Sequence, residues 1–125
     1  MAPSVPNLTG SPDAAKTPYG NHRSFPKESY PQYGGEKSVI YRSSDGKVVA
    51  GTARESGTTS LTYPCDEFFY VTQGWCDVKI HGGDSFRLNE GDCIYITKGT
   101  TADFIFSPEF WNTAVFIDSE KITQF

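Results

Sequence analysis

The stretch from Tyr63 to Gly99 decides the fold of this chain. It opens with Tyr63-Pro-Cys-Asp-Glu-Phe-Phe-Tyr-Val-Thr-Gln-Gly74 and closes with Glu90-Gly-Asp-Cys-Ile-Tyr-Ile-Thr-Lys-Gly99. Two further strand-like runs lie between these segments and meet at Gly82-Gly83. Runs of β-branched and aromatic residues that end in glycine turns predict antiparallel hairpins. The stretch therefore predicts a small antiparallel barrel, with the acidic residue Glu67 at the head of its first strand.

The same pattern continues on both sides of this stretch. Short strand-like runs recur at a spacing of ~8–12 residues, and no helical period extends over a dozen residues. This pattern predicts an all-β, single-domain protein, either a sandwich or a closed jelly-roll barrel. The nine expected strands are 38–42, 48–54, 58–63, 67–72, 75–81, 85–88, 93–97, 101–106 and 113–118.

Residues 1–36 form a different kind of segment, because six of the eight prolines lie there. Proline at this density disfavours both helix and central strand, so we expect an N-terminal arm before a barrel at 37–125. The composition up to residue 16 is typical of a disordered arm. Aromatic side chains then predict that 19–33 lies extended against the barrel or a partner subunit, with a disordered leader as the alternative. These side chains are Tyr19, Phe25, Tyr30 and Tyr33.

Composition narrows the possible partners. A net charge of −4 and the absence of a basic stripe argue against nucleic acid. No apolar run approaches the ~18 residues that a membrane-spanning helix needs. The start of the sequence lacks a signal-peptide pattern, and Cys65, Cys76 and Cys93 are an odd set without metal-binding spacing. We therefore expect a cytoplasmic protein with reduced thiols.

Two motifs resemble those of the cupin superfamily. Glu67, six residues and then Gly74 match the second half of the first cupin motif. Gly91-Asp92, four residues and then Thr97-Lys98-Gly99 resemble the second motif, with Thr97 in place of the usual proline. The resemblance covers about 48–118 and is greatest to ureidoglycine aminohydrolase and the ethanolamine-utilisation cupin. It implies an RmlC-like jelly-roll barrel, and cupins of this kind are commonly homodimers.

The resemblance also implies where a metal would bind. A metal-binding cupin usually supplies a His-x-His pair before the glutamate and a third histidine after the second motif. In this sequence those positions are Leu61, Tyr63 and Ala102, so Glu67 alone remains of the expected ligands. A catalytic transition metal needs about three protein ligands. We therefore expect no metal and no cofactor.

The remaining inward-facing residues predict an apolar pocket with few polar groups. Burial raises the pKa of a carboxyl, so Glu67 is the candidate general acid or base, with Tyr63 as its partner. The alternative is that Glu67 binds backbone groups at a strand start and Tyr63 only packs. The candidate substrate-binding residues are Arg54, Leu61, Phe69, Tyr95, Lys98, Ala102, Phe104 and Phe106.

These residues favour a metal-independent cupin enzyme that acts on a small, carbonyl- or acid-bearing molecule by proton transfer, as isomerases, epimerases, dehydratases and cyclases do. One alternative is a cupin that binds a small molecule without turnover. Another, implied by the resemblance, is acetate-kinase-like activity. Phe68, Tyr70 and Trp75 have outward parity on their strands, which predicts an aromatic outer face that a twin subunit covers.

Overall fold

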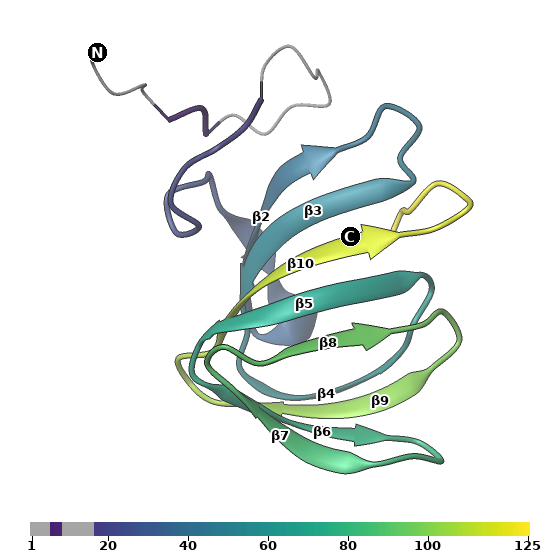
Figure 1. The fold of residues 1–125 in the computed structure, drawn as a ribbon. Helices are drawn as coiled ribbons and strands as arrows, with labels where there is room; N and C mark the ends of the chain where they lie inside the picture. Colours follow the sequence, from purple (N-terminus) through teal and green to yellow (C-terminus); the bar gives the residue numbers. More distant parts are fainter. Residues whose placement is uncertain (1–5, 9–16) are drawn as a thin grey trace.

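Two antiparallel sheets face each other across an apolar interior (Figure 1) in the computed structural model, which describes residues 6–8 and 17–125. The larger sheet has the strand order β1-β2-β3-β10-β5-β8, and the smaller has the order β4-β9-β6-β7. The first sheet comprises β1 (Glu28–Tyr30), β2 (Gly35–Arg42), β3 (Val48–Arg54), β10 (Trp111–Ile117), β5 (Asp66–Gln73) and β8 (Cys93–Ile96). The second comprises β4 (Gly57–Thr62), β9 (Thr101–Phe106), β6 (Trp75–Ile80) and β7 (Ser85–Asn89).

This arrangement confirms the predicted all-β jelly-roll fold. Each of the nine expected strands is present, with bounds that differ by a few residues at most. Consecutive strands repeatedly cross between the sheets, so that β4, β5 and β6 alternate between the smaller and the larger sheet. Gly74 makes one such crossing possible, because its φ is +73° and a Cβ there would lie 2.3 Å from Oγ of Ser107.

The core fills the space between the sheets. Strand alternation directs Phe69 and Val71 of β5 inward against Phe104 and Phe106 of β9, whose rings stack with centroids 5.6 Å apart. A second buried cluster combines segments that are distant in the sequence. It contains Tyr30, Val49, Cys65, Ile122 and Phe125.

The N-terminal segment packs on the barrel along part of its length. β1 forms an edge strand antiparallel to β2, and a 3-10 turn, η2 (Pro31–Tyr33), leads from β1 into β2. Phe25 and Tyr30 are buried, whereas Tyr19 remains exposed. The prediction of a disordered stretch up to residue 16 falls largely on 1–5 and 9–16, outside the described residues. Across the ranges that are described, η2 is the one helical element, and no helix is long and apolar enough to cross a membrane.

The predicted aromatic outer face needs a correction. Phe68 and Tyr70 are exposed on β5 of the larger sheet, 40% and 42% respectively. Trp75 begins β6 of the smaller sheet, and its ring lies under the guanidinium of Arg87 at 3.9 Å. The three side chains share outward parity but belong to different sheets, so they do not form one face.

Candidate functional site

A cavity of about 60 Å³ lies between the two sheets. Residues of β2, β3, β5 and β10 line it from the larger sheet, and residues of β4 and β9 line it from the smaller. Tyr30, Tyr33 and Phe125 also contribute to the lining from outside the central strands. Most of the lining is aliphatic or aromatic, so the few polar groups that reach it determine its chemistry.

Glu67 and Tyr63 meet in this cavity. The Tyr63 hydroxyl donates a hydrogen bond of 2.6 Å to Oε1 of Glu67, and both side chains are buried. Backbone hydrogen bonds hold Tyr63 in place, since its N–H donates to the carbonyl of Thr100 and its carbonyl accepts from Gly99. Strand register places Glu67 beside Phe116 of β10 on the inner face.

Burial raises the pKa of Glu67 to about 8, which is the largest effect on this group. The hydrogen bond from Tyr63 acts in the opposite direction, and the charge of Glu55 raises the pKa further. Burial also raises the pKa of Tyr63 far above its ordinary value of 10.0. The Glu67 carboxyl is therefore the group of this pair that exchanges a proton near neutral pH.

A second carboxyl, Glu55, also lines the cavity and was not predicted from the sequence. Asn112, which is buried on β10, donates a hydrogen bond of 2.7 Å from Nδ2 to Oε1 of Glu55. Burial raises the pKa of Glu55 to about 7, and the Asn112 hydrogen bond partly offsets this rise. Glu55 continues the inward alternation of Val49, Gly51 and Ala53, and that parity is the sequence signal that identifies it.

Two tyrosines from the N-terminal segment face these carboxyls. Tyr30 is the last residue of β1, which pairs with β2, and Tyr33 is the last residue of η2. The centroids of the two rings lie 4.6 Å apart. Burial is the main cause that raises the pKa of each phenol, and the charges of Glu55 and Glu67 add to it. Both hydroxyls therefore lie within electrostatic reach of both carboxyls.

Most of the predicted apolar residues lie where the sequence places them. Leu61, Phe69, Phe104 and Phe106 line the cavity together with Glu67 and Tyr63. Ala102 is fully buried but does not reach the lining, because it pairs with Leu61 of β4 and Ile80 of β6 within the packed core.

Three predicted substrate-binding residues lie outside the cavity. Arg54 is exposed and pairs with Glu36 at 2.9 Å, since Ala53 and Glu55 take the inward positions on either side of it. Tyr95 is 53% exposed, because Ile94 and Ile96 fill the inward positions of β8.

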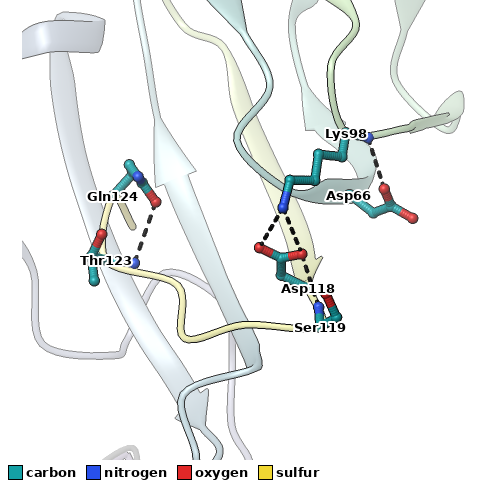
Figure 2. Close-up of polar contacts among 6 residues, drawn as sticks. All are labelled: Asp66, Lys98, Asp118, Ser119, Thr123 and Gln124. Atoms are coloured by element: carbon teal, nitrogen blue, oxygen red, sulfur yellow. Dashed lines mark hydrogen bonds and ion pairs between the residues drawn. The ribbon is translucent and has the colours of Figure 1, made fainter.

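Lys98 also lies outside the cavity, where it contacts the start of β5 and the residue that follows β10. Figure 2 shows that its backbone N–H donates to Asp66 and that its ammonium contacts Asp118 at 3.2 Å. Tyr95 donates to the other carboxylate oxygen of Asp66 at 2.6 Å. These contacts tie Lys98 and Tyr95 to the surface of the barrel rather than to its interior.

The donor set at the expected ligand positions does not fit a transition metal. Leu61 and Ala102 offer no ligand atom, and the Tyr63 hydroxyl is engaged with Glu67. No group of three or more His, Cys, Asp or Glu side chains suited to a metal ion occurs in 6–8 and 17–125. His81 is exposed and contacts Asp103, and the ring of His22 packs edge-on against Trp111.

Comparisons with known proteins place the barrel among cupins. A family model described as EutQ-like cupin domain matches residues 42–115. KdgF from Halomonas sp. is 17% identical, with a TM-score of 0.64, and the match covers 78% of this chain and 89% of that chain. An RmlC-like cupin from Shewanella frigidimarina NCIMB 400 is 14% identical, with a TM-score of 0.64, over 79% of this chain and 88% of that one.

A third structure, the Cnp3 cupin domain of Schizosaccharomyces pombe, is 11% identical with a TM-score of 0.62. Here the match covers 78% of this chain and 71% of that chain. At such identities the three structures show a shared fold. A search of curated protein sequences gives no significant match.

Proposed function

The chain belongs to the EutQ-like cupin domain family, and from this premise we propose that it binds a small organic molecule in its cavity and transfers protons to or from it without a metal. The reaction is of the isomerase, epimerase, dehydratase or cyclase type. The observation that carries the proposal is the buried Glu67 carboxyl in the cavity, hydrogen-bonded by Tyr63.

The chemistry follows from the surroundings of Glu67. A carboxyl with a pKa of about 8 is present in both protonation states near neutral pH, so it accepts and returns protons without a large energetic penalty. The Tyr63 hydroxyl stabilises the ionised form, and it is placed to donate to a substrate oxygen instead. Phe69 and Phe104 exclude water around the reacting atoms.

Deuterium incorporation tests this proposal even while the product is unidentified. The protein is incubated in deuterated water with a panel of small hydroxy acids, keto acids, amines and lactones, and each compound is then examined by mass spectrometry. We expect a compound that gains deuterium with the wild type and loses at least nine-tenths of that rate with Glu67→Gln. The matched control is Glu120→Gln, which removes an exposed carboxyl.

Deuterium exchange that is equal in the wild type and in folded Glu67→Gln would refute the role of Glu67. Elemental analysis of tag-free protein accompanies the assay. About one equivalent of bound transition metal per chain would refute the metal-independent part of the proposal.

A second candidate function is ligand binding without turnover. This alternative is favoured by the hydrogen bond from Tyr63 to Glu67. The bond already provides one carboxylate oxygen of Glu67 with a donor, so the pair can have a purely structural role. Saturable binding of a panel compound without any deuterium gain would favour this function. Within 6–8 and 17–125 no contact favours the acetate-kinase-like alternative, since two cavity carboxyls repel a polyphosphate.

A cytoplasmic location is part of the same proposal. Cys65, Cys76 and Cys93 are all free in the structure, and two of them are buried. Free thiols are typical of a reducing compartment. Quantitative thiol labelling of protein from freshly lysed cells is expected to find three reduced cysteines per denatured chain.

A further inference from the structure

We propose that the cavity takes a small organic cation, such as an alkylamine or an amidine, held between the carboxyls of Glu55 and Glu67. The inference rests on the cavity assigned above and names the chemical class of its ligand. It also replaces the acid-bearing molecule that the sequence predicted, because Arg54, the residue expected to bind that acid, lies outside the cavity.

The first argument is the unbalanced charge of the cavity. Glu55 and Glu67 both line it, and no lysine or arginine of the described ranges forms an ion pair with either carboxyl. Lys37 also contributes to the lining, but its ammonium pairs with Glu28 at 3.4 Å. Buried carboxylates are costly unless a cation compensates them, and a cationic ligand supplies that charge.

The second argument is the position of Tyr30. Its side chain is only 6% exposed and lines the cavity. The charges of both carboxyls act on this phenol, which places its oxygen near the cavity acids. The Tyr30 hydroxyl is therefore a further oxygen acceptor for an ammonium group held beside Glu55 and Glu67.

The aromatic rings provide a third contact suited to a cation. The ammonium of Lys37 already lies 4.8 Å from the centre of the Tyr30 ring, so this ring has a cation as neighbour on one side. Tyr30 and Tyr33 pack against each other and leave aromatic surface in the cavity lining. Aromatic surface beside carboxylates is the pattern by which proteins recognise organic ammonium groups.

The size of the cavity limits the ligand. About 60 Å³ holds roughly four water molecules, since each needs on the order of 10–15 Å³ of such space. A cation of about four non-hydrogen atoms fits this space. Propylammonium and acetamidinium are suitable probes, and propionamide and propionate have a similar size with neutral and negative charge.

Proton linkage gives the inference a specific signature. Without ligand the pKa of Glu55 is about 7 and that of Glu67 about 8, so both carboxyls are largely protonated at about pH 6. The other titratable groups near them are Lys37, whose ammonium pairs with Glu28, and five groups that are neutral in this range, namely Tyr30, Tyr33, Tyr63, Cys65 and Cys76. A cation requires both carboxyls in the ionised form, so its affinity rises with pH, by up to about a thousandfold between about pH 6 and about pH 9.

The experiment is a titration of the full chain by amide chemical-shift mapping at about pH 6.5 and about pH 8.5. We expect saturable shifts at the amides of Gly51 and Ala114 with propylammonium, at least tenfold tighter at the higher pH. Propionamide binds at least tenfold more weakly than propylammonium, and propionate does not bind. Glu55→Gln and Glu67→Gln each weaken propylammonium binding at least tenfold, and the exposed-carboxyl control Glu120→Gln does not.

Several results would overturn the inference. These are equal or tighter binding of propionamide or propionate, a propylammonium affinity that is independent of pH, and the absence of saturable shifts with both cations. A variant that fails to fold is replaced by Tyr33→Phe, which keeps the ring and removes one cavity oxygen and is expected to weaken binding at least threefold. Loss of cation binding with Glu67-dependent deuterium exchange intact would reject this inference and leave the proposed function in place.

Discussion

Ionisation of Glu67 is expected to make the folded state less stable as the pH rises. Its pKa is about 8 in the folded protein against an ordinary 4.5, because burial disfavours the charged form. For a carboxyl with a raised pKa, the folded state is most stable below the unfolded value and loses stability as the pH passes through the folded value. At about 1.4 kcal/mol per pH unit the difference corresponds to at most about 5 kcal/mol. Water penetration reduces it, so we expect about 2–5 kcal/mol.

Denaturant unfolding at about pH 5 and about pH 9 measures this quantity. The wild-type free energy of unfolding should fall over that interval, with Glu55 contributing in the same direction because its pKa is also raised. Glu67→Gln removes the ionisable group and should reduce the fall between these two pH values by about 2–4 kcal/mol. The control Glu120→Gln should behave as the wild type. Parallel curves for the wild type and Glu67→Gln would mean that Glu67 titrates as it does in the unfolded chain, which would refute the argument from burial.

Three further predictions concern the Tyr63 hydrogen bond, the core ring of Phe104 and the exposed aromatic side chains. Tyr63→Phe removes the 2.6 Å hydrogen bond to Glu67, so carbon-detected NMR should show the pKa of Glu67 above its wild-type value. The free energy of unfolding at about pH 9 should fall by about 1–2 kcal/mol. An unchanged pKa of Glu67 would contradict the role of this hydrogen bond. Phe104→Ala deletes a ring that contacts Tyr63, Phe69 and Phe106. It should lower the free energy of unfolding by about 3–5 kcal/mol, as measured by thermal or denaturant unfolding. A decrease of less than about 1 kcal/mol would contradict a core position for this ring. We also propose a homodimer whose interface covers the exposed side chains of Phe68, Tyr70 and Tyr95. Light scattering should then find a particle mass of two chains for the wild type, and Phe68→Ser should shift that mass toward one chain. A monomeric wild type would refute the proposal.

Alternation in the sequence was sufficient for much of the barrel. β5 and β9 alternate clearly between apolar and other residues, so Phe69, Phe104 and Phe106 were assigned to the interior and do lie there. The hairpin β6–β7 followed from Gly82-Gly83 in the same way. These elements were predictable because local chemistry and the sheet agree on which side is buried.

β8 shows where alternation is ambiguous. Its run Cys93-Ile-Tyr-Ile96 is apolar at both parities, so the pattern alone does not decide which side faces the core. The interior accepts Ile94 and Ile96, and Tyr95 reaches Asp66 at the surface instead. Arg54 has a similar explanation, since its neighbours Ala53 and Glu55 occupy the inward parity that continues past the strand end.

The polar residues from outside the central strands were the least predictable part of the site. Tyr30 and Tyr33 lie in a proline-rich segment without periodicity, and their positions depend on the pairing of β1 with the distant β2. Asn112 lies just before the expected strand 113–118, and its role emerges from the contact with Glu55. Contacts of this kind follow from tertiary packing, which a local pattern does not encode.

The position of Tyr30, Tyr33 and Phe125 in the cavity wall has a consequence for how this protein is compared and handled. All three line the cavity, yet all lie outside the matched range 42–115. A fragment trimmed to that range would keep both carboxyls and lose these three rings from the cavity wall. The segments outside the matched range therefore supply part of the cavity wall, so an experiment on the cavity needs the full chain.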